Sequence, residues 1–345
     1  MTLTVAPYAG PPASWDHFGQ SRPGWTHFHG HGWKSLIEEV FGHECPYLAA
    51  TDQGDRLAGV LPLVRVRSRI FGHYLVSMPF LNYGGPLGEP EAVRALATAA
   101  SAKAAEDGAD LLELRSRAVL PLDLPVSHRK ITVVLPLPPD RDALWKGFGS
   151  KLRNQVRRPE KAGVEIRVGE DQVGPFYQVF ARHMRDLGTP VLPRRWFEAI
   201  AERFGDAIWF GVAWHEGHPV AGGVAVRWAG EVEMTWASAL ASHSRLAANM
   251  LLYARFMERA VDAGASLFNF GRCSPGSGTH RFKQQWGARD EPLWWYQSTP
   301  RGRGAGDART PSPDQGALAL GPRVWKHLPL PLATALGPHI VRFIP

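Results

Sequence analysis

The chain repeats one pattern of residues in two places. Residues 54–63 consist of a polar turn, an Ala-Gly pair and an apolar run, and residues 217–226 follow the same order. In both places a second apolar run and a helical stretch come next, and the copies end in β-rich runs at 107–115 and 263–272. Glycine beside strands and helices is common, but two matching segments in the same order favour duplication over coincidence. The repeat predicts a duplicated α/β domain with a site where the halves meet.

Length and composition are those of an ordinary globular protein of about two domains. The chain has 345 residues, of which 44% are hydrophobic and 21% charged, and chains of this length often form more than one core. The formal net charge is +7. This excess suits nucleic acid, nucleotides, phosphorylated sugars or an anionic membrane surface. An arginine-rich composition from a GC-rich genome explains it equally well.

The cysteine, histidine and apolar patterns argue against several classes of protein. Cys45 and Cys273 lie far apart, so neither a disulfide framework nor a thiolate zinc site is expected. His27, His29 and His31 alternate in a Gly-rich segment without an acidic partner, and we expect no metal there. The first residues lack a signal-peptide pattern, and no apolar run reaches the ~20 residues of a spanning helix. A cytoplasmic location is therefore expected.

Hydrophobic periodicity and turn residues predict four parts. These are an irregular lead-in at 1–30, a first domain at 31–139, a second at 140–298, and a flexible linker with an apolar tail at 299–345. The boundary follows the Pro-rich connection at 136–139. The expected helices are 33–41, 91–106, 141–161, 174–187, 194–204 and 247–263. The expected strands are 47–51, 57–66, 73–80, 111–114, 131–135, 164–168, 208–214, 220–228, 232–238 and 267–270.

Several segments resemble the FemAB-like proteins. Residues 270–287 end an apolar strand in Phe-Gly, continue through a Gly-rich loop and close with Phe-Lys-x-x-Trp-Gly. The basic segment 151–158 is similar to that family's basic helix. Residues 77–85 and 187–190 look like the branch associated with exosortase/PEP-CTERM exopolysaccharide systems. The resemblance extends over about residues 30–298.

The resemblance implies an α/β (α+β) fold of two tandem GNAT-like domains, each a mixed, mostly antiparallel sheet with flanking helices. Better-known relatives transfer an amino acid from aminoacyl-tRNA to an amine on a peptidoglycan precursor, and the reaction is carried over only as a class. The chain has neither a Ser-His-Asp order nor a nucleophile elbow. Direct attack of an amine on an activated donor is therefore the simpler mechanism.

Lys283, inside the Gly-rich signature, is the predicted catalytic residue. A cation there would neutralise donor phosphate or charge on the leaving group, and the alternative is a surface lysine. Arg153 and Arg157, at i and i+4 on one helical face, suit a phosphate-rich ligand or form a solvated basic face. Asn82 and Tyr83 lie where a strand gives way to a helix, and we expect them to position the acceptor.

Arg115 and Arg272 lie at equivalent ends of the repeated final strand, where each could hold a carboxylate or phosphate. Glu113 lies on the same strand face as Arg115, so an internal ion pair is the leading alternative. The predicted substrate-binding set is completed by residues of the second domain: Thr189, Trp236, Asn249, Tyr253, Ser277, Thr279 and Phe282.

The acyl donor is open between aminoacyl-tRNA and acyl-CoA, and no other cofactor is expected. A CoA-dependent GNAT protein usually has Arg/Gln-x-x-Gly-x-Gly/Ala where backbone amides bind the pyrophosphate at a helix start. The matching residues 245–250 lack both glycines, which disfavours CoA.

We therefore predict a FemAB-like N-acyl or aminoacyl transferase that acts on a cell-envelope or exopolysaccharide precursor. Its acceptor would be a phosphorylated sugar, a peptide or an amine. The alternatives are an acyl-CoA-dependent GNAT N-acyltransferase and a non-catalytic GNAT-like scaffold in polysaccharide or secretion machinery. In the tail, apolar residues with Lys326 and Arg342 either form a peripheral anchor at the inner face of the membrane or pack on the main body.

Overall fold

The computed structural model describes residues 2–300 and 320–345, which divide into two compact units. The first unit contains the described residues up to Lys130, the segment from Pro292 to residue 300, and Ile340–Pro345. The second contains Ile131–Glu291 and the tail up to His339. This division differs from the predicted boundary at 139/140, because the strand Ile131–Pro136 pairs with Leu267–Cys273 in the sheet of the second unit.

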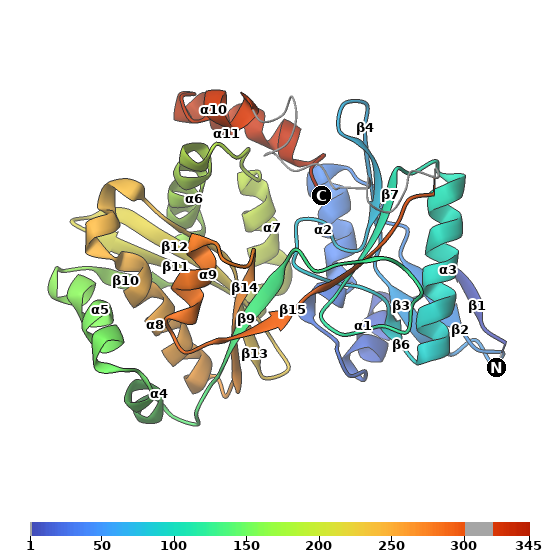
Figure 1. The fold of residues 1–345 in the computed structure, drawn as a ribbon, viewed down its shortest axis with the longest axis horizontal. Helices are drawn as coiled ribbons and strands as arrows, with labels where there is room; N and C mark the ends of the chain where they lie inside the picture. The colour runs from blue at the N-terminus through green and yellow to red at the C-terminus, as the bar shows by residue number, and fades with distance from the viewer. Residues whose placement is uncertain (1, 301–319) are drawn as a thin grey trace. The chain divides into compact units, whose positions relative to one another are not determined.

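The first unit contains two sheets and the long helix α3 (Figure 1). One sheet has the order β1-β2-β3-β6 and the other the order β4-β5-β7-β16-β8. Its helices are α1 (Pro12–Gln20), η1 (His27–His29), α2 (Gly32–Phe41) and α3 (Pro90–Glu106). Its strands are β1 (Thr4–Pro7), β2 (Leu48–Thr51), β3 (Leu57–Leu61), β4 (Val64–Ser68), β5 (Gly72–Val76), β6 (Leu87–Gly88), β7 (Leu111–Ser116), β8 (Val126–Ser127) and β16 (Trp294–Ser298).

Two sequence expectations for this unit need correction. The segment predicted as an irregular lead-in contains β1 and α1, and Trp15 of α1 is buried, with its indole N–H donating to the His29 carbonyl at 2.7 Å. The single strand predicted at 57–66 is two strands in different sheets. Pro62 lies between them, and proline cannot donate to a strand ladder.

The second unit is built on one sheet with the order β10-β11-β12-β13-β14-β9-β15. Its strands are β9 (Ile131–Pro136), β10 (Glu165–Val168), β11 (Ile208–His215), β12 (His218–Trp228), β13 (Glu231–Ala239), β14 (Leu267–Cys273) and β15 (Arg289–Pro292). Its helices are α4 (Arg141–Gly147), α5 (Ser150–Lys161), η2 (Glu170–Gln172), α6 (Val173–Leu187), α7 (Arg194–Phe204), η3 (Gly205–Ala207), η4 (Ala241–Leu246), α8 (Ala248–Asp262), α9 (Gly278–Gln284), α10 (Leu320–Trp325) and α11 (Leu330–Val341).

Helices cover both faces of this sheet because successive side chains of a strand point to opposite faces. On β11, Phe210 contacts Phe176 of α6, with ring centroids 5.8 Å apart, whereas its neighbour Trp209 lies under Arg259 of α8. Phe197 of α7 packs on Phe176 as well, at 5.0 Å. Thus α6 and α7 lie on one face and α8 on the other.

The sequence repeat corresponds to a repeated structural unit. In the first unit β5 and β7 are parallel and α3 precedes β7, while in the second β13 and β14 are parallel and α8 precedes β14. Both helices end at a glycine with positive φ, Gly108 at 63° and Gly264 at 72°. In each case the next amide donates to the carbonyl five residues back, as in a Schellman motif.

The tail packs on the second unit through α10 and α11. Trp325 is buried, and the Arg185 guanidinium donates to the Leu328 carbonyl at 3.1 Å. The flexible linker predicted at about 301–314, within the part 299–345, lies outside the described residues. Within the described residues, no helix is long and apolar enough to cross a membrane.

Candidate active site

The parallel strands β13 and β14 pair over a short length and then separate. The pairs are Glu231 with Leu267, Val232 with Phe268, and Glu233 with Asn269. Beyond Glu233, β13 continues to Ala239 with only β12 beside it, and in the described sheet no strand pairs with its other edge. Apart from the Ala239 backbone, which bonds the His183 ring, backbone N–H and C=O groups on this edge have no neighbouring strand in the described sheet and could pair with an extended ligand.

A cavity of about 280 Å³ lies at the end of β13, and we call it the β13–α8 pocket. Side chains from α6, β13, α8 and α9 line it. They are His183, Ala237, Ser238, Ala239, Asn249, Leu252, Tyr253, Gly278, Thr279 and Phe282. Four predicted site residues, Asn249, Tyr253, Thr279 and Phe282, therefore line one cavity. None of the lining residues is Asp, Glu, Lys or Arg, so recognition here depends on hydrogen bonds and shape.

Tyr253 combines a packed ring with an unoccupied hydroxyl. The ring stacks on Phe270 at 5.6 Å and meets Phe282 edge-on at 5.0 Å, and only 5% of the residue is exposed. Within the described residues its hydroxyl makes no hydrogen bond. Burial raises the pKa of Tyr253 above its ordinary value, so the hydroxyl stays protonated near pH 7 and can donate a hydrogen bond to a bound group.

His183 and Ser238 supply two further polar groups to this pocket. Burial lowers the pKa of His183, whose ring is hydrogen-bonded to the backbone of Ala239. The imidazole is therefore neutral near pH 7 and able to accept a proton. The Ser238 hydroxyl is buried and has no partner among the described residues.

The structure places Lys283 in the interior, outside the lining of the β13–α8 pocket. Its ammonium donates to the carbonyl oxygens of Gly271 at 2.6 Å and Arg272 at 3.1 Å, and the residue is 2% exposed. Burial lowers its pKa to about 8. The contacted carbonyls lie where β14 shifts register against β9, with Gly271 at a φ of 73°. In this arrangement Lys283 holds the irregular end of β14.

The predicted basic stripe on α5 also has partners inside the unit. The Arg153 guanidinium donates to the carbonyls of Trp145 at 3.2 Å and Phe148 at 2.8 Å, which fixes the corner between α4 and α5. Arg157 lies 6.0 Å from the Trp145 ring centroid. Lys151, on the same helix, lines a separate hollow of about 360 Å³ beside Gly149 and Trp286.

Arg115, Asn82 and Tyr83 lie in the first unit. Arg115 is 1% exposed and donates to Glu113 at 2.7 Å, which confirms the internal ion pair, and its guanidinium lies 4.5 Å from the Trp295 ring. Asn82 and Tyr83 are buried, and Tyr83 packs on Phe28 with ring centroids 5.4 Å apart. Tyr83 and Arg115 line a small cavity of about 120 Å³.

The remaining predicted residues have structural contacts. Ser277 caps α9, where its hydroxyl accepts from the His280 amide at 3.1 Å. The Trp236 ring meets Phe197 edge-on at 5.5 Å. Thr189 follows α6, and its amide donates to the Met184 carbonyl at 2.9 Å. Arg272 pairs with Thr132 in the sheet and accepts from Lys283 through its carbonyl.

Two pocket residues with polar side chains, His183 and Ser238, were absent from the sequence prediction. A signal for His183 exists, because it continues the buried face of α6 that includes Val179 and Phe180 at helical spacing. A histidine at such a position marks a polar group among apolar ones. Ser238 carries no comparable signal, since a serine near a strand end is common.

His29 is one of the three alternating histidines, and both nitrogens of its ring are hydrogen-bonded. Nδ1 accepts from the Thr26 amide at 3.1 Å, so the proton lies on Nε2, which donates to the Gly85 carbonyl at 3.1 Å. Burial lowers the pKa of His29 to about 4. In the described parts of the chain, no group of three or more His, Cys, Asp or Glu side chains is arranged to hold a metal ion.

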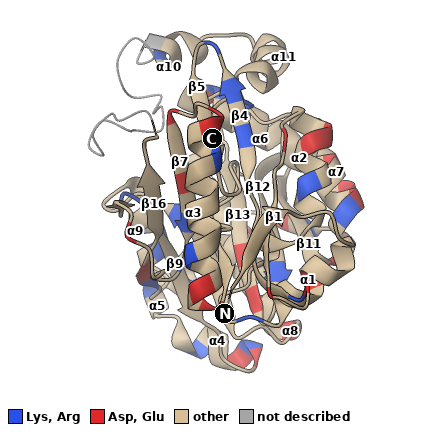
Figure 2. Ribbon diagram, turned by 90° about the vertical axis from the view of Figure 1, so that its right-hand side faces the viewer, with Lys and Arg blue, Asp and Glu red and all other residues tan. Residues whose placement is uncertain are grey.

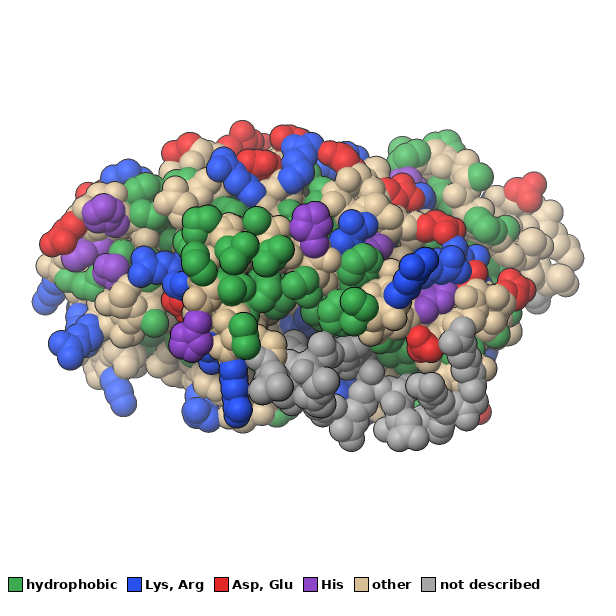
Figure 3. All heavy atoms as spheres, turned by 90° about the horizontal axis from the view of Figure 1, so that it is seen from above, with side chains coloured by type: hydrophobic (Ala, Val, Ile, Leu, Met, Phe, Trp, Pro, Cys, Tyr) green, Lys and Arg blue, Asp and Glu red, His purple; other side chains and the backbone are tan. Residues whose placement is uncertain are grey.

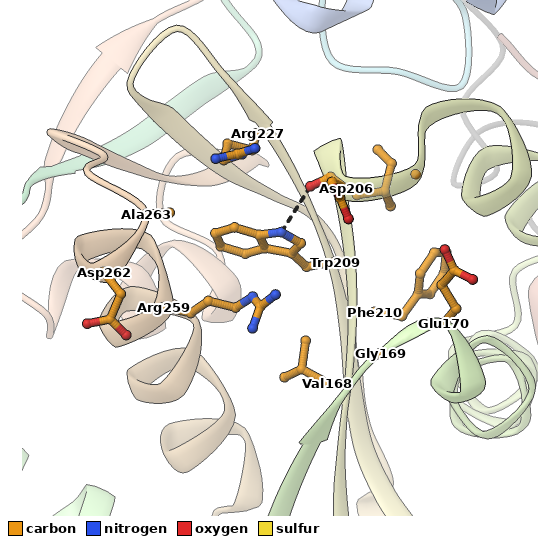
Figure 4. A pocket seen from close by; sticks show the side chains of 12 residues that line it. Val168, Gly169, Glu170, Asp206, Trp209, Phe210, Arg227, Arg259, Asp262 and Ala263 are labelled. Atoms are coloured by element: carbon orange, nitrogen blue, oxygen red, sulfur yellow. Dashed lines mark hydrogen bonds between the residues drawn. The ribbon is translucent and has the colours of Figure 1, made fainter.

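A larger hollow of about 420 Å³ lies near the other end of α8 (Figure 4). Trp209 lies there between Arg227 and Arg259, and Asp206 and Glu170 stand at the side. These four charged residues are exposed and of both signs, whereas no Asp, Glu, Lys or Arg lines the β13–α8 pocket. In Figure 2 Lys and Arg are interspersed with Asp and Glu, so the net positive charge does not form one basic face in that view.

Comparison with known proteins identifies the type of domain and fold. Residues 147–284 match the family described as "Acetyltransferase (GNAT) domain". No curated protein matches the chain. The structure is similar to the crystal structure of FemX, with a TM-score of 0.66 at 12% identity over 87% of this chain and 98% of that one.

Two further solved structures are similar to this chain. One is the C-terminal domain of a putative lysylphosphatidylglycerol synthetase from Agrobacterium fabrum, with a TM-score of 0.55 and 14% identity over 79% of this chain and 88% of that one. The other is a tandem GNAT protein from the clavulanic acid biosynthesis pathway. Its TM-score is 0.52 and its sequence identity 13%, over 87% of this chain and 99% of that one. The fold is thus that of tandem GNAT proteins, as the sequence predicted.

Proposed function

We propose that the protein is an N-acyl or aminoacyl transferase whose reaction takes place in the β13–α8 pocket. The observation that carries the proposal is the Tyr253 hydroxyl, protonated and without a partner within the described residues, at a cavity beside the open edge of β13. All residues that line the cavity belong to the segment that matches the GNAT domain, and such domains transfer acyl groups to amines.

The proposed reaction is direct attack of an amine on the acyl carbonyl of an activated ester or thioester. An extended donor lies along the unpaired edge of β13, where backbone groups hold it. The neutral His183 imidazole accepts the proton that the amine loses as the C–N bond forms. Tyr253 gives its proton to the departing oxygen or sulfur as the carbonyl–donor bond breaks, and proton exchange restores both groups. Holding the reactants together contributes as well.

The proposal also concerns the class of acyl donor and the acceptor. The name of one structural neighbour, a putative lysylphosphatidylglycerol synthetase, favours an aminoacyl donor, and the tandem GNAT protein favours acyl-CoA. The resemblance to FemAB-like proteins favours an amine on a cell-envelope or exopolysaccharide precursor. The proposal includes peripheral contact with the inner face of the membrane, where such precursors are met.

A transfer screen with the purified chain tests the proposal. The protein is incubated with charged tRNAs or with a set of acyl-CoA thioesters, together with amine acceptors, and the products are detected by mass spectrometry. We expect one donor class to yield an amide product. If neither class binds and neither yields a product, the enzymatic proposal is wrong and a scaffold role gains support.

A further inference from the structure

The tail is held firmly on the second unit by close contacts. A side chain at Gly188, where φ is 79°, would come within 2.4 Å of the Pro322 carbonyl, and one at Gly337 would come within 2.8 Å of the Val191 backbone nitrogen. Together with the Arg185–Leu328 hydrogen bond, these contacts fix α10 and α11 at the end of α6 and the segment after it. The orientation of the tail's outer surface is therefore defined.

That outer surface is apolar, although it is the opposite side of the helices that packs on the second unit. Ala333 and Gly337 of α11 are buried, while Leu332 and Leu336, one helical turn apart, are 44% and 43% exposed. On α10, Val324 is 64% exposed. A helix that only stabilised its own unit would carry polar residues on this side. We call Val324, Leu332 and Leu336 the tail patch.

Exposure of this kind is concentrated in the tail. In the described chain six large hydrophobic residues are exposed, and three of them form the tail patch within residues 320–345. A fourth, Leu187, ends the helix on which α10 packs and is 53% exposed. Figure 3 shows a group of neighbouring hydrophobic side chains that is bordered by Lys, Arg and His and also by Asp and Glu.

The charge of the tail is one-sided. Residues 320–345 include Arg323, Lys326 and Arg342 and no Asp or Glu. Arg323 and Lys326 are exposed on or beside α10, next to Val324 in sequence. Apolar side chains flanked by basic ones suit a surface that is apolar inside and negative outside, as an anionic lipid bilayer is. A second copy of the chain would bring the same positive charge and be repelled.

We propose that the tail patch docks on an anionic lipid bilayer, with the leucines and Val324 in the acyl region and Arg323 and Lys326 on the headgroups. This deepens the membrane contact in the proposed function, and it does not depend on the acyl-transfer chemistry. Docking would hold the second unit at the membrane surface.

Vesicle co-sedimentation of the full chain tests the docking. Vesicles of phosphatidylcholine alone are compared with vesicles that also contain phosphatidylglycerol. We expect the anionic vesicles to bind the protein at least tenfold more tightly. Leu332→Gln with Leu336→Gln, and separately Arg323→Gln with Lys326→Gln, should each lower that affinity at least tenfold. Ile70→Gln, at a residue that is 85% exposed in the first unit, is the matched control and should change nothing.

Thermal unfolding of each variant shows that the fold is kept, and transfer to a soluble amine should remain at the wild-type rate. The proposal is overturned if the wild type does not prefer anionic vesicles or if the tail variants bind like the wild type. Binding to an acidic protein without binding to vesicles also overturns it. Loss of transfer in every protein, with vesicle binding intact, counts against the proposed function and leaves the docking standing.

Discussion

Ser238 has a buried hydroxyl with no hydrogen-bond partner within the described residues. Such a group lowers the stability of the folded protein by roughly 1–3 kcal/mol. Lys283, Arg115 and Arg153 differ from it, because each donates to oxygen atoms of its own unit. At the residue scale, the predicted cations maintain the structure, and within the described residues the hydroxyls of Ser238 and Tyr253 at the β13–α8 pocket make no hydrogen bond.

Ser238→Ala is expected to raise the free energy of unfolding by about 1 kcal/mol, because it removes a polar group that has no partner. The same change should weaken donor binding. Ser77→Ala is the matched control: Ser77 is fully buried and its hydroxyl accepts from the Arg115 amide at 2.7 Å, so its loss should destabilise the protein. Denaturant unfolding gives both values. A loss of stability in Ser238→Ala would show that the hydroxyl has an internal partner.

Lys283 should make stability depend on pH in the alkaline range. Its pKa is about 8 in the folded protein against an ordinary value of 10.5, so between these values the unfolded chain binds more protons. The contribution of Lys283 is complete above pH 10.5 and is lost as pH falls through 8. The free energy of unfolding of the wild type, relative to Lys283→Met, should therefore rise from pH 8 to 10.5. A constant difference would contradict the buried position of the ammonium.

At the element scale, two tight loops shape the central hairpins of the second unit. Glu216 and Gly217 join β11 to β12, and Ala229 and Gly230 join β12 to β13. All four residues have positive φ, at 49°, 77°, 37° and 78°. Two-residue hairpin loops of this kind favour Asn-Gly, since a left-handed conformation disfavours other side chains.

Ala229→Asn should therefore raise the free energy of unfolding by about 0.5–1 kcal/mol. Glu216→Asn should act in the same direction, because its position in the other loop is equivalent. Denaturant midpoints measure both changes. The opposite change, Gly230→Ala, should destabilise the protein. Unchanged midpoints in all three variants would mean that the loops do not have the positive φ values described.

Most elements could be predicted from local pattern, and the failures have physical causes. The alanine-rich helix α3 and the amphipathic helix α8 lie within a residue of their predicted bounds. The strand at 57–66 failed because Pro62 ends the ladder. The sheets to which β9 and β16 belong could not be predicted from local pattern. β9 pairs with a strand more than 130 residues later, and β16 pairs with β7 some 180 residues earlier.

For the site, four residues predicted from the sequence line one cavity, whereas the predicted catalytic residue lies outside that lining. Tyr253, Asn249, Thr279 and Phe282 were predicted and line one pocket. Lys283, adjacent to Phe282, points inward to the Gly271 carbonyl instead. Phe282 and Lys283 are neighbours on the short helix α9, and their side chains point in different directions. Which of the two lines the cavity depends on where the end of β14 lies, and the sequence alone does not give that position.

At the scale of the whole molecule, the two units share a repeated strand–helix–strand arrangement and differ in the polar residues that it contains. Both contain a strand, a helix ended by glycine, and a parallel strand. The third residue of the final strand is buried and polar in each, Glu113 in one and Asn269 in the other. Glu113 is paired with Arg115, while Asn269 donates to Glu231 at 2.8 Å. The GNAT-family match and the β13–α8 pocket belong to the second unit.

The most direct measurement of the central claim is the single-turnover rate of acyl transfer by Tyr253→Phe and by Tyr177→Phe. Tyr253→Phe removes only the hydroxyl that we propose as the acid, so the rate should fall about 100-fold, with donor affinity and Tm unchanged. Tyr177 donates to the Leu192 carbonyl at 3.1 Å, so Tyr177→Phe should lower stability by about 1 kcal/mol and keep the wild-type rate. A Tyr253→Phe enzyme that transfers at the wild-type rate would contradict the account.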